Sequence, residues 1–374
     1  MKSSSKKDIV IIGLTITSSW GNGHATTYRG LVRELSRRGY NVLFLERDMP
    51  WYAGNRDQPD PLYGSTELYS SIRELKEKYT FAIQNARMVI VGSFVPDGTV
   101  VGEWVTRTAK GVSAFYDIDT PVTMGKLKRK DCEYLSPHLV SRYDLYLSFA
   151  GGPILDLLEQ VYGSPMARPL YCSVDTALYY PEEADLKYDL GYMGTFCADR
   201  QEPMELLMLD TAKEWAEGRF VIAGPQYPKE IRWPDNVERI EHLAPSLHRK
   251  FYCSQRFTLN LTRAEMVHAG HAPSVRLFEA AACGVPIISD YWEGLSSFFS
   301  FGEEILLSNS PEDTHKYLTL IPECKRRSIG EKARKRVLSE HSAAHRAKEL
   351  ESYCLEAEKM KHRKKNGVYT YKHV

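Results

Sequence analysis

The chain has 374 residues, which is long for one doubly wound domain and enough for two domains that each bury a core. Its 49 basic and 48 acidic residues leave a formal net charge of +1, so no global field attracts nucleic acid or another polyanion. The seven cysteines are odd in number and form no Cys-x-x-Cys pair. This argues against a disulfide framework or a structural metal and predicts a reducing compartment.

The first residues predict a cytoplasmic protein. Polar and basic residues lead directly into a short apolar run, residues 9–12. That run is too short for the apolar region of a signal peptide or for a membrane span. We therefore expect a soluble protein.

Short β-branched runs alternate with longer amphipathic stretches along the chain, which is typical of βα units that build a parallel sheet. The first series of strands is expected at residues 8–14, 41–46, 88–92, 113–117, 145–148 and 169–173. A polar segment, residues 56–78, interrupts this series and is either specific to an acceptor or a solvated insertion. An acidic stretch after Pro181 is the expected linker. The second series is expected at residues 190–193, 219–223, 237–241, 257–261, 286–289 and 304–307.

The chain is therefore expected to be an α/β protein with two Rossmann-like domains. We predict an N-terminal domain over residues 1–180, a C-terminal domain over residues 181–340, and a helix with a basic tail over residues 341–374. Ala, Glu, Lys and Leu recur at helical spacing from Ser339 to about Lys361, with Ser339 or Ser342 as the cap. The basic residues 359–365 form either a solvated tail or a weak peripheral membrane contact.

A polar loop, residues 18–24, follows the first strand and precedes a helix that begins near Ala25. Such a loop brings backbone N–H groups to the carboxyl edge of a parallel sheet. Its glycines do not follow the Gly-x-Gly-x-x-Gly spacing, which disfavours NAD. His24 is a candidate catalytic base or hydroxyl ligand, or it only caps the helix. Gly23 is a candidate acceptor contact.

Asp117 and Asp119 lie at the carboxyl end of a predicted strand, and their side chains alternate onto one side of an extended chain. Paired carboxylates in a crevice accept sugar hydroxyls or a proton. We assign Asp119 to catalysis and Asp117 to the acceptor. An Asx turn with a helix cap is the competing explanation.

The most informative passage is residues 271–290. Pro273 and Ser274 begin a helix, whose free N–H groups at Ser274 and Val275 can receive a diphosphate. Glu279 lies further along this otherwise apolar helix, where its carboxylate can accept ribose hydroxyls. Gly284 ends the helix before a buried strand.

The run from Glu279 to Pro286 resembles the C-terminal signature of retaining glycosyltransferases with the glycosyltransferase-B fold, in particular those similar to the spore-maturation protein CgeB. That family carries two glutamates separated by seven residues, and the second contacts the donor ribose. The resemblance assigns this role to Glu279. His271 occupies the first position, which departs from the family at the residue that contacts the sugar.

A second correspondence lies at the entry to the C-terminal domain. The family has a Gly-Arg pair at a strand end and a lysine five residues after the arginine, all at the diphosphate. Gly194, Thr195 and Arg200 occupy these places, so Arg200 keeps the positive charge that Thr195 lacks. Arg263 or Arg276 is expected to compensate, because a guanidinium binds phosphate oxygens in bidentate fashion. Each arginine is alternatively part of a surface salt bridge.

The family's base-binding loop corresponds to His242 and Leu243, whose main-chain groups are expected to contact the base, and Gly224 begins another donor-site loop. Family frequency favours uridine. The resemblance implies hexosyl transfer from a nucleoside diphosphate sugar, bound by the C-terminal domain, to an unknown acceptor (a glycan, lipid-linked sugar, protein or small molecule) bound mainly by the N-terminal domain. A helix N-terminus and arginines can neutralise the leaving group, so we expect no metal or further cofactor, and the near-zero net charge predicts no nucleic acid partner. A nucleotide-sugar 2-epimerase and a catalytically silent nucleotide-sugar-binding protein are the alternatives.

Overall fold

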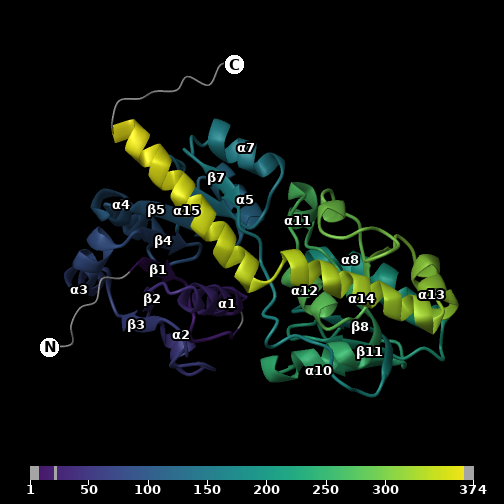
Figure 1. Cartoon of the computed structure of the whole chain (residues 1–374). Helices are drawn as coiled ribbons and strands as arrows, with labels where there is room; N and C mark the ends of the chain where they lie inside the picture. Colours follow the sequence, from purple (N-terminus) through teal and green to yellow (C-terminus); the bar gives the residue numbers. More distant parts are fainter. Residues whose placement is uncertain (1–7, 21–22, 366–374) are drawn as a thin grey trace. The chain divides into compact units, whose positions relative to one another are not determined.

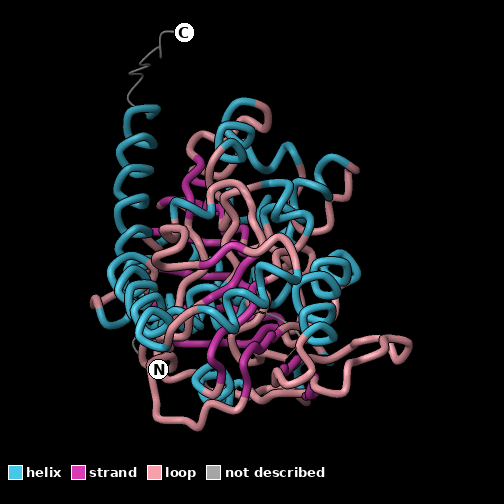
Figure 2. Tube along the Cα trace, turned by 90° about the vertical axis from the view of Figure 1, so that its right-hand side faces the viewer, coloured by secondary structure: helices cyan, strands magenta, loops and turns pink. Residues whose placement is uncertain are grey.

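The computed structural model describes residues 8–20 and 23–365, and these residues form two compact units (Figure 1). The first unit contains the described residues up to Cys172 together with those from Ala343 onward, and the second contains Ser173–Ser342. Each unit is built on one parallel β-sheet with helices beside it, and Figure 2 shows the strands in magenta and the helices in cyan. The prediction of an α/β chain with two Rossmann-like domains is confirmed.

Seven parallel strands form the sheet of the first unit, in the order β3-β2-β1-β4-β5-β6-β7. The strands are β1 (Ile9–Gly13), β2 (Val42–Arg47), β3 (Ser65–Tyr69), β4 (Met88–Gly92), β5 (Val112–Asp117), β6 (Leu145–Ser148) and β7 (Ala167–Pro169). The helices are α1 (His24–Arg37), α2 (Pro50–Ala53), α3 (Ile72–Asn85), α4 (Gly98–Thr108), α5 (Thr120–Lys128), α6 (Pro137–Val140), α7 (Pro153–Gln160) and α15 (Ala343–Lys365). Strands β1 and β4 are buried along their whole length, which explains their unbroken apolar sequences.

Two strands of this sheet differ from the sequence prediction. Strand β3 lies within the polar segment of residues 56–78, where no strand was predicted. It pairs with β2 at the edge of the sheet, and only its Tyr69 is buried. An edge strand of this kind needs no apolar run, which is why the sequence did not reveal it. Strand β7 comes earlier than predicted, because the apolar run continues beyond the strand to Leu170, which packs in the core as the chain leaves the sheet.

Six parallel strands form the sheet of the second unit, in the order β10-β9-β8-β11-β12-β13. The strands are β8 (Tyr188–Met193), β9 (Phe220–Ala223), β10 (Val237–Ile240), β11 (Gln255–Asn260), β12 (Ile287–Ser289) and β13 (Leu306–Leu307). The helices are α8 (Gln201–Met204), α9 (Thr211–Glu214), α10 (His248–Cys253), α11 (Ala264–Ala269), α12 (Val275–Ala282), α13 (Pro311–Leu320) and α14 (Glu323–Glu340). A π-helical segment, Glu205–Asp210, joins α8 to α9. All six strands were predicted, with shifted ends.

The last helix, α15, belongs to the first unit and packs against α1 and β5 (Figure 1). It begins at Ala343 rather than at Ser339, because the preceding helix α14 runs through to Glu340. Its buried face includes Leu350 and Cys354 within the core of the first unit. The units therefore divide at residues 172/173 and 342/343, whereas the sequence suggested borders near 180 and 340 and a separate terminal segment.

The basic stretch predicted as a tail is in part the end of α15. The ammonium of Lys361 contacts the Asp144 carboxylate at 2.8 Å and the Gly111 carbonyl oxygen at 2.6 Å. Met360 packs against the core. Residues 366–374 lie outside the described residues. Within the part of the chain that the structure describes, no helix is both long enough and apolar enough to cross a membrane.

Candidate functional site

Three loops of the first unit meet at the topological switch point of its sheet. Strand β1 has β2 on one side and β4 on the other, so the loops after β1 and β4 diverge at the carboxyl edge. Doubly wound sheets bind ligands in this position. His24 comes from the first loop as the first residue of α1, Ser93 follows β4, and Asp119 follows β5.

The structure brings together the two residues predicted to be catalytic. His24 Nε2 lies 2.9 Å from Asp119 Oδ2, with side-chain exposures of 7% and 27%. Ser93 Oγ donates to the same carboxylate oxygen at 2.8 Å. A histidine held in this way can accept a proton while the carboxylate stabilises the imidazolium that forms. Ser93, which was not predicted, fixes the carboxylate from the neighbouring strand.

Asp117 is fully buried, whereas we predicted an acceptor contact. Its carboxylate accepts hydrogen bonds from Thr123 Oγ1 at 2.7 Å, Tyr146 Oη at 2.5 Å and the backbone N–H of Asp119 at 3.1 Å. Burial, and to a smaller degree the charge of Asp119, raises the pKa of Asp117 to about 7, although the Tyr146 and Thr123 hydrogen bonds lower it. With its oxygens occupied, Asp117 shapes the turn that presents Asp119.

A buried carboxylate that sequence reasoning missed holds the loop after β1. Glu46 accepts hydrogen bonds from the backbone N–H of Ile16 at 2.7 Å and from the backbone N–H and hydroxyl of Thr17 at 3.0 and 2.7 Å. The available signal was an acidic residue inside the apolar run of β2. Gly23 is exposed and precedes α1 at its N-cap, and residues 21–22 of the predicted loop lie outside the described residues.

The second unit has its own switch point between β8 and β11. Gly194 follows β8 and Gly224 follows β9, and the two loops touch. A Cβ atom at Gly224 would lie 2.0 Å from the Gly194 carbonyl oxygen, and Gly224 has a φ of +148°, so only glycine fits there. Tyr227 Oη also donates to the Gly194 carbonyl at 3.2 Å.

Arg276 is buried and connects the ends of β8 and β11. Its Nε donates to the Met193 carbonyl at 2.7 Å, and its Nη1 donates to Asn260 Oδ1 at 3.0 Å. The guanidinium also lies over the Tyr192 ring, 4.7 Å from its centroid. These contacts occupy most of its donors, so Arg276 holds the switch point together and is a weaker phosphate ligand than predicted.

Arg200 and Arg263 both lie near Asp199, in the loops that follow β8 and β11. Arg200 Nη2 donates to the Thr195 carbonyl at 2.7 Å, and Arg263 Nε lies 3.9 Å from Asp199 Oδ2. Although burial acts to raise the pKa of Asp199, hydrogen bonds and the two arginines lower it. The Nε atoms of both arginines lack a hydrogen-bond partner among the described residues. These two nitrogens are buried, whereas the Arg263 side chain as a whole is 43% exposed and can meet an anion through its other nitrogens.

Glu279 is 6% exposed and lies on α12, which begins after Ser274. The Ser274 hydroxyl donates to Asn260 Oδ1 at 2.8 Å rather than capping the helix, which leaves the N–H groups at the start of α12 without a side-chain cap. Tyr252 Oη donates to Glu279 Oε2 at 3.2 Å. Burial raises the pKa of Glu279 to about 7, opposed by hydrogen bonds from Tyr179 and Tyr252.

A chain of hydrogen bonds leads from Glu279 to the predicted base-binding loop. Tyr179, which bonds to Glu279, also lies 3.4 Å from His248 Nδ1, and His248 Nε2 lies 3.2 Å from the Leu243 carbonyl oxygen. His242 is exposed beside it. Sequence reasoning missed Tyr179, Tyr252 and His248, because their role depends on contacts between segments far apart in the chain.

His271 lies in the turn between α11 and α12 and has a φ of +46°, in the left-handed region. Its backbone N–H donates to the Glu293 carbonyl at 2.6 Å. Its ring packs against Gly294, where a Cβ atom would lie 2.3 Å from Nδ1. Such strain in a histidine is often found at functional sites. Val275 follows as the first residue of α12 and is half-buried.

Comparisons with known proteins agree with the two-domain fold. Residues 200–352 match a family model described as glycosyl transferase-like. Among solved structures, a sucrose-phosphate synthase from Thermosynechococcus elongatus has 14% sequence identity and a TM-score of 0.66, over 94% of this chain and 99% of that one. HepE from Anabaena in complex with UDP-glucose has 12% identity and a TM-score of 0.67, over 93% and 99%.

An alpha-glucosyltransferase in complex with UDP has 10% identity and a TM-score of 0.63, over 93% of this chain and 99% of that one. A search of curated protein sequences finds no match. Residues 200–352 thus carry a glycosyl transferase-like domain, in a chain that has the two-domain glycosyltransferase-B fold.

Proposed function

We propose that the protein transfers a hexosyl unit from a nucleoside diphosphate sugar, preferably a UDP-sugar, to a hydroxyl group of an acceptor. The observation that carries this proposal is that Arg200, Arg263, the start of α12 and Glu279 all follow the neighbouring strands β8 and β11, in the unit that contains most of the glycosyl transferase-like match. The similar structures of HepE with UDP-glucose and of the alpha-glucosyltransferase with UDP support the choice of uridine. We also propose that the chain is CgeB-like within these enzymes.

The donor is held by three kinds of contact. The free N–H groups at the start of α12 and the guanidinium groups of Arg200 and Arg263 receive the diphosphate, which neutralises the leaving group without a metal ion. The Glu279 carboxylate accepts the ribose hydroxyls, and main-chain groups at His242 and Leu243 contact the base. Gly194, Thr195, Gly224 and Ser274 shape the diphosphate pocket, and His271 contacts the sugar.

In the first unit, His24 accepts the proton of the acceptor hydroxyl and Asp119 stabilises the resulting imidazolium. Retention of the anomeric configuration is proposed, as the resemblance to retaining enzymes implies. Proton NMR of the first-formed glycoside measures this directly. An inverted product would overturn retention and show that the acceptor oxygen, deprotonated by His24, attacks in line with the departing diphosphate.

Calorimetric titration with UDP, GDP, ADP and dTDP, in the presence of EDTA, tests the donor site. We expect selective binding of UDP, weakened by about 1–3 kcal/mol in Glu279→Gln through the loss of charged hydrogen bonds to ribose. Glu217→Gln, which changes an exposed glutamate in a turn, is the matched control. Failure of all four nucleotides to bind a folded sample would eliminate the donor site, and binding that requires a divalent cation would eliminate metal independence.

Turnover separates the proposed transferase from its alternatives. UDP-sugars are incubated with a panel of glycan, lipid-linked and small-molecule acceptors, and UDP release is measured. His24→Gln should lower the rate by about 10²–10⁴-fold while leaving UDP affinity unchanged, because it removes only proton transfer. Release of UDP and an epimerised free sugar without acceptor would indicate an epimerase. Tight UDP-sugar binding without turnover under any acceptor would indicate a silent binding protein.

A further inference from the structure

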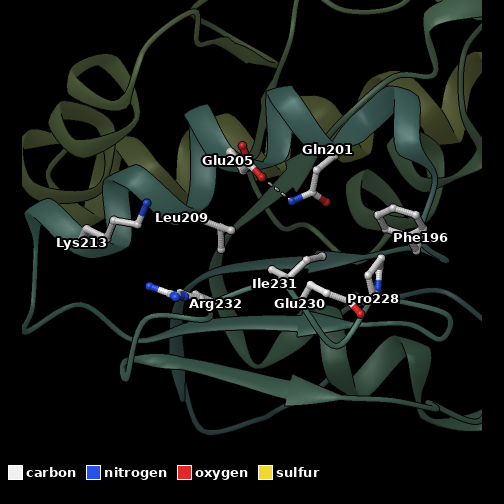
Figure 3. Close-up of a pocket in the computed structure, with 9 residues that line it drawn as sticks. All are labelled: Phe196, Gln201, Glu205, Leu209, Lys213, Pro228, Glu230, Ile231 and Arg232. Carbon is white, nitrogen blue, oxygen red and sulfur yellow. Dashed lines mark hydrogen bonds between the residues drawn. The ribbon is translucent and has the colours of Figure 1, made fainter.

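The second unit contains a cavity of about 350 Å³ that the proposed reaction does not use (Figure 3). One wall is the helical stretch from α8 to α9, and the other is the segment of residues 228–232 after β9. A volume of this size suits a small organic ligand. Among the residues assigned above to the donor or to catalysis, none lines this cavity.

The helical wall presents one row of side chains. Gln201, Glu205, Leu209 and Lys213 are spaced by four residues and lie on the same face, as Figure 3 shows. The central part of this stretch is π-helical, a rare conformation that is frequently found at functional sites. Polar groups therefore lie at both ends of the row, and Leu209 is apolar between them.

The facing wall carries apolar, acidic and basic side chains, from Pro228, Glu230, Ile231 and Arg232. Figure 3 shows Ile231 opposite Leu209, and Arg232 at the same end of the cavity as Lys213. Lys213 has a carboxylate neighbour, Asp210, at 2.7 Å. Arg232 has neither a hydrogen-bond nor an ion-pair partner in the described part of the chain. Phe196 lies at the opposite end and presents its ring.

The facing wall is anchored rather than loose. Arg239 donates to the carbonyl oxygens of Ile222 at 2.6 Å and Gly224 at 2.9 Å. Its guanidinium contacts the rings of Tyr227 and Trp233, 4.2 and 4.6 Å from their centroids. These contacts fix the start and end of the segment that carries Ile231 and Arg232, so the cavity is pre-formed.

We propose that this cavity binds a small organic anion. Its phosphate or carboxylate group lies between Lys213 and Arg232, where two cations from opposite walls provide charge-assisted hydrogen bonds. Its apolar or aromatic body lies between Leu209 and Ile231 and extends toward the Phe196 ring. The site needs no covalent step and stands independently of the proposed transferase activity.

The test uses 1-naphthyl phosphate as a probe, titrated calorimetrically into the full chain, with inorganic phosphate and 1-naphthalenemethanol as the two halves of the probe. One molecule should bind per chain, and each half should bind at least tenfold more weakly. Arg232→Gln should weaken binding of the probe about tenfold, because it removes a charged hydrogen-bond donor. Lys229→Gln, an exposed neighbour that does not line the cavity, should change nothing.

A second variant separates this cavity from the diphosphate site. Arg263→Gln should leave probe binding unchanged, because Arg263 does not line the cavity. Binding that is lost in Arg263→Gln but kept in Arg232→Gln would overturn the proposal, since the probe would then occupy the diphosphate site. Absence of binding, or equal affinity in wild type and Arg232→Gln, would also overturn it. Arg232 is exposed, and thermal unfolding verifies that the variant folds.

Discussion

Asp117 and Glu279 are buried carboxyl groups in similar surroundings, one in each unit. Each accepts a tyrosine hydroxyl, from Tyr146 and Tyr252 respectively. Burial is the largest influence in both cases and raises the pKa of each group to about 7. Both groups thus hold or release a proton near neutral pH, unlike ordinary carboxyl groups.

The raised pKa of Asp117 predicts how stability depends on pH. Between about pH 4 and pH 7 the folded protein holds a proton that the unfolded chain releases, so stability is highest below this window and falls as pH rises through it. Within this window the free energy of unfolding falls by about 1.4 kcal/mol per pH unit for one such group. Asp117→Asn should reduce this slope, as measured by urea unfolding at pH 4.5, 5.5, 6.5 and 7.5. An unchanged slope, equal to that of the exposed control Asp60→Asn, would contradict the assignment.

Changing Arg276 to glutamine should mainly lower stability, whereas changing Arg263 to glutamine should mainly lower UDP affinity. Arg276→Gln leaves the buried Met193 carbonyl without its side-chain donor, at about 1–3 kcal/mol, whereas Asn260 keeps the hydrogen bond from Ser274. Arg263→Gln changes a side chain that is 43% exposed, so its effect on stability should stay within about 0.5 kcal/mol, while UDP affinity falls. Thermal unfolding and calorimetry measure the two effects. Equal stability losses would contradict the distinction.

At the scale of elements, α15 is a structural part of the first unit. Leu350 lies in the core between the helix and the sheet, whereas Leu355 on the same helix is 47% exposed. Ion pairs of Arg87 with Glu358 and of Lys361 with Asp144 add contacts along the helix. Helix α15, at the end of the described chain, therefore packs on the same core as β1, the first strand.

Leu350→Ala should destabilise the protein by about 2–5 kcal/mol, because it removes buried methyl groups and leaves a cavity under α15. Leu355→Ala is the matched control and should change stability by less than about 0.5 kcal/mol. Denaturant unfolding monitored by circular dichroism compares the two variants. If both variants unfold at the same denaturant concentration as the wild type, α15 is not part of the folded core.

At the scale of the whole molecule, the second unit is one continuous insertion into the first. Its two ends are adjacent: the Val174 N–H donates to the His341 carbonyl at 3.1 Å, and Val174 pairs with Ser342 in a parallel bridge. The unit has its own sheet and its own apolar core, which includes Leu190 and Phe257. A domain that has its own hydrophobic core, and whose two chain ends are adjacent, is able to fold alone.

Residues 173–342 expressed alone should therefore unfold cooperatively and bind UDP with the affinity of the full chain, since the proposed donor contacts all lie within this segment. Thermal unfolding and calorimetry provide the two measurements. A non-cooperative transition would show that the unit depends on the remainder of the chain. A cooperative fold without UDP affinity, where the full chain binds, would place part of the donor site in the first unit.

Local patterns in the sequence were enough to predict the strand series and the fold class. Strands such as β4 and β6 were predicted to the residue, because buried parallel strands are unbroken apolar runs. Glu279 was recognisable as a candidate because an acidic residue conflicts with its apolar surroundings, whereas Gly224 was proposed from the resemblance to the glycosyltransferase family. Strand β3 was missed, because an edge strand carries no comparable pattern.

By itself, then, the sequence determined the α/β fold class, the two sheets and the residue types of the candidate site, because these follow from side-chain periodicity and local motifs. Only the tertiary structure decided that α15 returns to the first unit, that Arg276 bonds to the ends of two strands, and that Glu279 is linked to Tyr179. These arrangements join residues far apart in the chain, such as Arg87 and Glu358, which are 271 positions apart. No local pattern records such pairs, because they are selected by the packing of the folded chain.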